Sequence, residues 1–107
     1  MASKFVVERK SGQDLYGTLL QGHKRFKRQI LRAEKAGIQM VVYVECTKQY
    51  FLALKFPGGA YRKCPGAVLS KIIHTVSTRY NLEFVWCRNR TELKKAIIKR
   101  LRQEEKL

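Results

Sequence analysis

The segment from Ile38 to Glu45, IQMVVYVE, constrains the fold of this chain more than any other. Its residues are almost continuously apolar instead of alternating between apolar and polar, which is typical of a parallel strand covered on both faces. Such a strand needs helices packed against the sheet and joined to it by right-handed crossovers. The segment therefore predicts an α/β protein with a mostly parallel central sheet flanked by helices.

The rest of the sequence alternates strand and helix patterns in the order that this architecture requires. Further strands are predicted at Phe5–Lys10 and Leu82–Cys87, and helices at 11–20, 23–36, 65–80 and from Thr91, which is expected to cap the last helix. Tyr50–Phe56 is assigned either to an edge strand or to a loop packed on the core. The apolar residues expected to face inward on the last two helices are Val68, Leu69, Ile72, Ile73 and Val76, then Leu93, Ile97, Ile98 and Leu101.

The charge of the chain points to a polyanionic partner. At 107 residues the sequence is expected to form one domain, 1–107, with 23 Lys and Arg against 8 Asp and Glu, a net charge of +15. Such an excess favours nucleic acid as the partner. Because the basic residues are spread along the chain, the binding surface is expected to belong to the fold itself. A basic RNA-associated structural protein is one alternative with the same charge profile.

The predicted helix at 23–36 carries a strongly basic outer face. It contains Lys24, Arg25, Lys27, Arg28, Arg32 and Lys35, with Glu34 as the one acid. A helix that only faces solvent usually mixes charges of both signs, whereas this one repels itself. Phosphates would neutralise that repulsion, so we predict that this face contacts nucleic acid. A merely solvated face is the alternative.

The first predicted strand ends in three consecutive charges, Glu8, Arg9 and Lys10. Glu8 and Lys10 share one face of a strand, and Arg9 points to the other. A Glu-x-Lys strand end suits phosphodiester hydrolysis, because the carboxylate holds a hard cation and the ammonium steadies the attacking water or the developing charge. Two simpler interpretations stay open. The triplet is a solvated strand end, and Ser11-x-x-Asp14 is a capping box in which Asp14 serves only the start of a helix.

The cysteines and histidines do not predict a metal or disulfide framework. Cys46, Cys64 and Cys87 are odd in number and far apart, and His23 and His74 sit at no metal-ligand spacing. Reduced thiols are the expectation. No apolar run reaches membrane-spanning length and no signal-peptide pattern is found, so we expect an intracellular protein, in the cytoplasm, nucleoid or nucleus, without a membrane partner.

Two stretches together identify a family resemblance. VVERKSGQDLYGTLLQGHKRF and CPGAVLSKIIHTVSTRYNLEFVWCRNRTEL resemble the signature of the XPF-type (Mus/Hef-like) structure-specific endonucleases, within the restriction-endonuclease-like superfamily. The E-R-K-x-x-x-D motif of that family corresponds here to Glu8, Arg9, Lys10 and Asp14, and the likeness covers residues 5–103. The resemblance implies a restriction-endonuclease-like core that cuts DNA at branched or flap junctions with a divalent metal, working as a homodimer or heterodimer.

The resemblance also implies roles for individual residues. Glu8 and Asp14 would bind Mg²⁺ or Mn²⁺, Lys10 would orient the attacking water, and Arg9 would fix the site or a phosphate. Glu45, at the carboxyl end of the central strand, is a further candidate for the metal, with an ordinary strand-end acid as the alternative. DNA would be positioned by Lys24, Arg25, Lys27 and Arg28 of the basic helix and by Arg62, Lys63, Arg88 and Arg90.

One departure from the family pattern concerns the metal site. The family carries a Gly-Asp-Tyr segment on the strand before the E-R-K strand, and its Asp completes the site. Here only residues 1–4 precede the strand, and Asp14 is the sole aspartate. We therefore expect a domain shortened at its N-terminus relative to the family. Three interpretations stay open: a shortened form of a longer protein, substitution by Asp14 or Glu45, and a non-catalytic DNA-binding or dimerisation module of the same fold.

Overall fold

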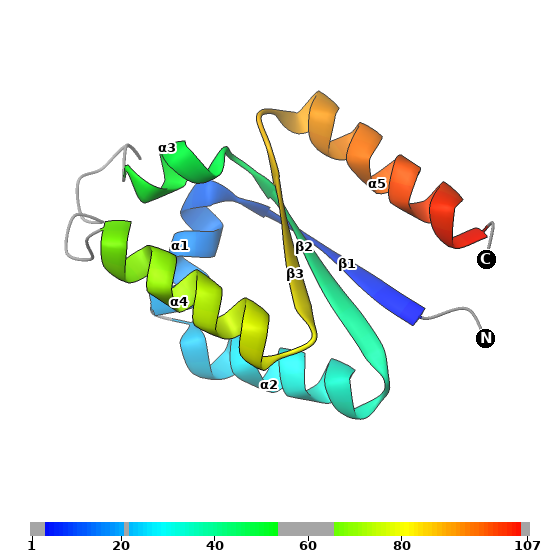
Figure 1. Ribbon diagram of the computed structural model, residues 1–107, viewed down its shortest axis with the longest axis horizontal. Coiled ribbons are helices and arrows are strands. Elements are labelled where there is room, and N and C mark those ends of the chain that lie inside the picture. Colours follow the sequence, from blue (N-terminus) through cyan, green and yellow to red (C-terminus); the bar gives the residue numbers. More distant parts are fainter. Residues whose placement is uncertain (1–3, 21, 54–65, 106–107) are drawn as a thin grey trace.

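A parallel sheet forms the centre of the computed structural model, which describes residues 4–20, 22–53 and 66–105. Its strands are hydrogen-bonded in the order β1-β2-β3, so β2 is central and the other two form the edges of the described sheet (Figure 1). Both pairings are parallel. The strands are β1 (Lys4–Ser11), β2 (Ile38–Glu45) and β3 (Leu82–Cys87). This arrangement confirms the predicted α/β class.

Helices connect the strands and cover both faces of the sheet. Figure 1 shows α1 to α4 on one side and α5 alone on the other. The bounds are α1 (Gly12–Leu20), α2 (His23–Lys35), α3 (Lys48–Leu52), α4 (Gly66–Arg79) and α5 (Arg90–Glu105). Because parallel neighbours need a crossover, the helices between successive strands follow from the strand order. None of the described helices combines the length and apolar character that crossing a membrane requires.

Alternation along β2 divides the core into two clusters. Met40, Val42 and Val44 pack with residues of α1 to α4, whereas Val41 and Tyr43 pack with Leu93 of α5. All of these strand residues are buried. The continuous apolar pattern of β2 therefore has the predicted cause, since each of its faces meets a separate layer of helices.

Arg100 attaches α5 to all three strands. Its guanidinium donates hydrogen bonds to Gln39 Oε1 at 3.3 Å on β2 and to Glu83 Oε2 at 3.2 Å on β3. The same group lies 5.4 Å from the ring centroid of Phe5 on β1. An ion pair, an amide contact and a cation–π contact thus hold one helix across the full width of the sheet.

Two helices bury fewer apolar side chains than predicted. Ile98 and Leu101 are 50% and 46% exposed on α5, and Val68 is also exposed on α4. A helix presents one stripe to a sheet, and on α5 this stripe includes the buried Leu93 and the partly buried Ile97. The prediction that Ile98, Leu101 and Val68 face inward is therefore wrong.

The assignment of Tyr50–Phe56 to an edge strand or loop is wrong for residues 50–52, which belong to α3. Thr47 caps this helix, because its Oγ1 accepts a hydrogen bond from the Tyr50 N–H at 3.2 Å. Phe51 is fully buried, with its ring centroid 6.3 Å from that of Tyr16 and 5.4 Å from that of Trp86. Burial of this one ring, with the cap, favours a helical turn here. Residues 54–56 lie outside the described part of the chain.

The last helix is capped by a different residue from the one predicted. Asn89 Oδ1 accepts a hydrogen bond from the Glu92 N–H at 2.9 Å, so Asn89 caps α5 and Thr91 lies inside its first turn. Near this end of the sheet, Cys46 and Cys87 are buried free cysteines. Burial raises the pKa of both thiols above the ordinary range. Cys64 lies outside the described residues.

Candidate active site

Glu8 and Lys10 form an ion pair near the carboxyl end of β1. The register places them opposite Val42 and Val44, which face the α1–α4 core, so both side chains lie on that face of the sheet. Lys10 Nζ is 3.6 Å from Glu8 Oε1, and the side chains of Lys10 and Glu8 are 16% and 37% exposed. The prediction that these two residues share a face is confirmed.

A cavity of about 930 Å³ adjoins this ion pair. Glu8, Arg9 and Lys10 line it from β1, Asp14 from α1 and Arg25 from α2. Arg9 belongs to the opposite strand face by alternation, yet it borders the cavity because β1 is an edge strand of the described sheet. The four residues of the E-R-K-x-x-x-D motif thus line one cavity, and Arg25 of the basic helix lines it with them.

Asp14 lies both at the capped start of α1 and at the wall of the cavity. Its main-chain N–H donates a hydrogen bond to Ser11 Oγ at 3.1 Å, so Ser11 caps α1 as the sequence indicates. Asp14 also lines the cavity with Glu8. A carboxylate in the first turn is favoured by the helix dipole whatever else it does. Capping and cavity lining are therefore compatible.

The carboxylates at this cavity fit one kind of metal site. Mg²⁺ keeps several waters and is usually held by one or two carboxylates together with substrate phosphates. Glu8 and Asp14 supply two such carboxylates. Within the described part of the chain, no three or more His, Cys, Asp and Glu residues gather to hold an ion by themselves. The residues fit a cation that completes its ligands with water and DNA oxygens, and they do not fit an all-protein cage.

Glu45 lies apart from Glu8 and Asp14. It is paired in register with Ser11, alternates onto the α5 face of β2, and lies 3.9 Å from Arg90 Nε. It lines a second cavity of about 560 Å³. The structure does not bring Glu45 together with the other two acids, so its assignment to the metal stays a prediction without support from this arrangement.

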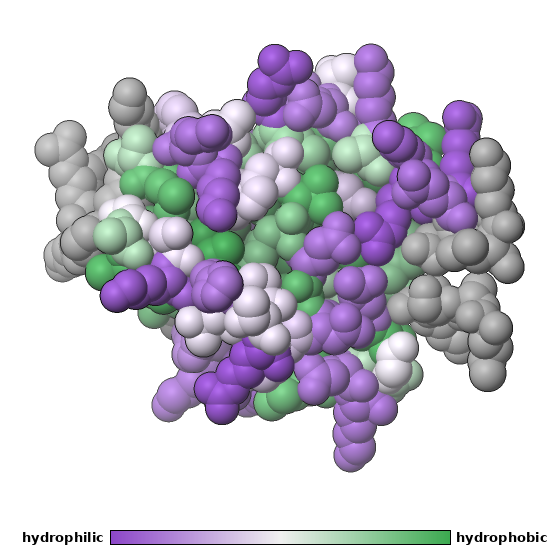
Figure 2. Space-filling view, viewed as in Figure 1, coloured by the Kyte–Doolittle hydropathy of each residue, from purple (hydrophilic) through white to green (hydrophobic). Residues whose placement is uncertain are grey.

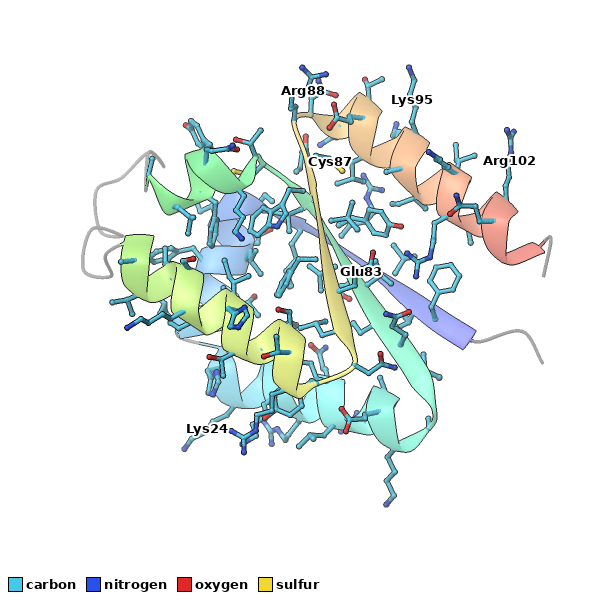
Figure 3. The ribbon with its side chains drawn as sticks, viewed as in Figure 1. Lys24, Glu83, Cys87, Arg88, Lys95 and Arg102 are labelled. Atoms are coloured by element: carbon cyan, nitrogen blue, oxygen red, sulfur yellow. The ribbon has the colours of Figure 1, made fainter. Side chains whose placement is uncertain are left out.

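The predicted DNA-contacting residues occupy two regions. Lys24, Arg25, Lys27 and Arg28 are exposed on α2, because Phe26 and Ile30 are buried and turn the basic face outward. Lys24 projects away from the sheet in Figure 3. Hydrophilic residues project around the outline of the face seen in Figure 2. Arg88 and Arg90 lie where β3 meets α5, and Arg62 and Lys63 lie outside the described residues.

Ion pairs partly neutralise the second region. Arg88 Nε donates a hydrogen bond to Glu92 Oε2 at 2.9 Å, and the Arg88 main-chain N–H donates to Glu92 Oε1 at 3.2 Å. These hydrogen bonds lower the pKa of the Glu92 carboxyl below its usual value. Together with the Arg90–Glu45 pair, they leave this region close to neutral.

Several residues that line these cavities were not predicted as site residues, Gln13 and Tyr50 among them. Gln13 lines both cavities from the first turn of α1, and Tyr50 lines the second from α3. Gln13 sits within the E-R-K-x-x-x-D motif, next to Asp14, and that position was a usable signal. Tyr50 was assigned to an edge strand or a loop, and no local pattern in the sequence indicated that it borders a cavity.

Comparison with known proteins gives one match. The family model described as the ERCC4 domain matches residues 1–99. No curated protein and no solved structure matches the chain. The matched range contains the residues of both cavities. It is consistent with the XPF-type resemblance and with the restriction-endonuclease-like α/β core expected from it.

Proposed function

The chain belongs to the ERCC4 domain family, a nuclease-type family, and on that premise we propose that it is a metal-dependent endonuclease that cuts DNA at branched or flap structures. One observation carries the proposal. Glu8, Lys10 and Asp14 line a single cavity together with Arg9 and Arg25. Two carboxylates among several cations form a set that can receive both a divalent metal and a phosphodiester.

The carboxylates of the cavity would bind the divalent cation. Glu8 and Asp14 would hold Mg²⁺ or Mn²⁺, with remaining ligands from water and DNA. When bound, the cation supplies Lewis-acid polarisation of the scissile phosphate and lowers the pKa of a coordinated water.

Lys10 has the environment of a positioning group. Its side chain is mostly shielded from solvent, and its ammonium lies next to the Glu8 carboxylate. A cation in this setting can donate hydrogen bonds to the attacking water or to a phosphate oxygen, and partial burial strengthens the interaction relative to bulk water. Arg9 and Arg25 lie at the border of the same cavity, where guanidinium groups can bind phosphate oxygens with two hydrogen bonds.

The positions of the predicted DNA-contacting residues support a DNA substrate with more than one arm. The basic face of α2 reaches the cavity through Arg25, whereas Arg88 lies at the turn after β3 (Figure 3) and Arg90 begins α5. A duplex along α2 would bring its backbone to the cavity, and a second arm would leave toward the β3–α5 turn. Action as a homodimer or heterodimer and an intracellular location stay predictions.

A non-catalytic DNA-binding module of the same fold is the second candidate. The observation that favours it is the small donor set, since the described residues contain no cluster of three metal-ligating groups. Such a module would keep the basic face of α2 and the fold but would not cut.

A cleavage assay tests the proposal against this alternative. The purified chain is incubated with labelled flap, fork and linear duplex DNA of matched sequence in Mg²⁺, Mn²⁺ or EDTA. We expect cleavage of the flap and fork with either metal and none in EDTA. Binding without cleavage under every metal condition would favour the non-catalytic module, and equal cutting of linear duplex would contradict the branched specificity.

A further inference from the structure

A second cavity adjoins the candidate active site where the three strands end. It has a volume of about 560 Å³ and is lined by Ser11, Gln13, Glu45, Thr47, Tyr50 and Arg88, among others. Gln13 also lines the first cavity, so the two hollows share a wall at the start of α1. We propose that the second cavity holds an unpaired nucleotide of the DNA strand, with its base stacked on Tyr50. This inference rests on the proposed function for its ligand.

The fold directs Tyr50 outward by burying its neighbour. Phe51 is fully buried between Tyr16 and Trp86 and anchors α3 to the core. Because adjacent residues of a helix lie about 100° apart around its axis, Tyr50 cannot share that direction. It is 45% exposed. The Thr47 cap holds the Tyr50 main chain and limits how far the ring can move with the helix end.

A single exposed tyrosine is ordinary on a protein surface, and its surroundings distinguish this one. Tyr50 lines a concave site instead of a convex surface, and Arg88 lines the same site. Single-stranded nucleic acids are commonly bound by an aromatic ring for the base beside a cation for the backbone. Tyr50 provides the ring at the second cavity, and Arg9, Lys10 and Arg25 of the adjoining first cavity provide the cations for the backbone.

The charges of the two cavities favour a base over a phosphate in the second. There Glu45 is balanced by Arg90 at 3.9 Å and Arg88 by Glu92 at 2.9 Å, so the local charge is close to zero. The first cavity instead carries Arg9, Lys10 and Arg25 against two carboxylates. A DNA strand can therefore place a phosphate among the cations of the first cavity and a neighbouring neutral base in the nearly neutral second cavity.

An unpaired base is the form that can use this ring. A base inside a duplex is stacked on both sides, and exposing its face costs a few kcal/mol of unstacking. An unpaired base at a flap or fork does not require that step. The second cavity would therefore add affinity for single-stranded segments without adding affinity for linear duplex.

Fluorescence anisotropy of labelled oligonucleotides in EDTA tests this directly. The probes are a single-stranded oligonucleotide and a blunt duplex of the same length, at one salt concentration. We expect Tyr50→Ala to weaken single-strand binding by roughly fivefold or more and to leave duplex binding unchanged. Tyr50→Phe should bind as wild type, since it keeps the ring. Ile98→Ala, at a 50% exposed apolar residue of α5, is the matched control and should show no selective loss.

Two results would overturn the inference: equal affinities of Tyr50→Ala and wild type for the single strand, or equal losses on single strand and duplex. If the alanine variant does not fold, Tyr50→Leu replaces it, because it keeps apolar bulk but has no aromatic face. In a second measurement, a fluorescent adenine analogue is placed along the single strand. We expect one position to be quenched on binding wild type and Tyr50→Phe, but not Tyr50→Ala.

These outcomes separate the inference from the proposed function. Both measurements are made without metal and report binding alone. If wild type never cleaves DNA but Tyr50→Ala selectively loses single-strand binding, the nuclease proposal is rejected and the stacking site is kept. Normal metal-dependent cleavage with no effect of Tyr50→Ala would reject the stacking site and keep the nuclease.

Discussion

The Lys10 ammonium lies 3.6 Å from the Glu8 carboxylate, and the lysine is the more deeply buried of the two side chains. This order is unusual for a strand that simply ends in water, where a long cation extends into solvent. Here the cation is held beside a carboxylate at the wall of a cavity. The relationship favours a site in which Glu8 and Lys10 act together.

Removing either member of this pair should stop cleavage. We expect Glu8→Ala and Lys10→Ala each to lower the cleavage rate by roughly a hundredfold or more while DNA affinity stays nearly intact. Glu8→Ala should also cost about 1 kcal/mol of unfolding free energy, because Lys10 loses its partner. The measurements are single-turnover cleavage, anisotropy and chemical denaturation. Glu83→Gln is the control, since Glu83 lines neither the first nor the second cavity and should cut as wild type. Wild-type cleavage by Glu8→Ala would reject the site.

Asp14→Asn distinguishes a metal ligand from a cap residue. Ser11 Oγ accepts its hydrogen bond from the Asp14 main-chain N–H, so the substitution leaves that bond in place. The free energy of unfolding should therefore fall by about 1 kcal/mol or less. As a metal ligand, Asp14 supplies one of two carboxylates, and its loss should raise the Mg²⁺ concentration needed for cleavage. Ser11→Ala is the converse control, with lower stability and an unchanged Mg²⁺ requirement. A Mg²⁺ titration of Asp14→Asn that overlays wild type would leave only the capping role.

The basic face of α2 should account for much of the salt dependence of DNA binding. Replacing Arg25, Lys27 and Arg28 together by alanine should weaken binding to all sequences alike. It should reduce the slope of log affinity against log salt by roughly 0.9 for each phosphate that the variant no longer neutralises. The matched control replaces three exposed lysines of α5, on the opposite side of the sheet, namely Lys94, Lys95 and Lys99. Equal slopes in the two triple variants would show that α2 has no special role.

The start of α5 gives a stability test of the cap. Asn89→Ala should lower the unfolding free energy by about 1 kcal/mol, because the Glu92 N–H loses its acceptor. Thr91→Ala should change it much less, since Thr91 lies within the helix. Urea denaturation followed by Trp86 fluorescence measures both. A larger loss in Thr91→Ala than in Asn89→Ala would contradict this cap.

Glu92 should make a pH-dependent contribution to stability. Hydrogen bonds from Arg88 lower its pKa in the folded chain below the ordinary 4.5, so its stabilising effect is present above that pH and is lost as the pH falls through the lowered value. The melting temperature of wild type should therefore exceed that of Glu92→Gln most clearly near neutral pH. The difference should shrink in acid. A difference that grows as the pH falls would have the wrong sign.

Local patterns in the sequence determined most of the architecture. The continuous apolar run of β2 required cover on both faces, and the two clusters around Val42 and Tyr43 provide it. Alternation alone placed Glu8 and Lys10 on one face, and the Ser11 cap followed from its spacing to Asp14. These features depend on residues that are close together in the sequence, so periodicity and capping rules can predict them.

Only the tertiary structure decided which distant residues meet. Arg25 lines the same cavity as Glu8 because α2 packs beside β2 and α1. Glu45 faces away from Glu8 because parallel register and alternation set it on the other side of the sheet. Tyr50 reaches its cavity because Phe51 is buried against rings from two other elements. Strand register and long-range burial create these relationships, and a period of two or 3.6 residues specifies a face but not the partner that covers it.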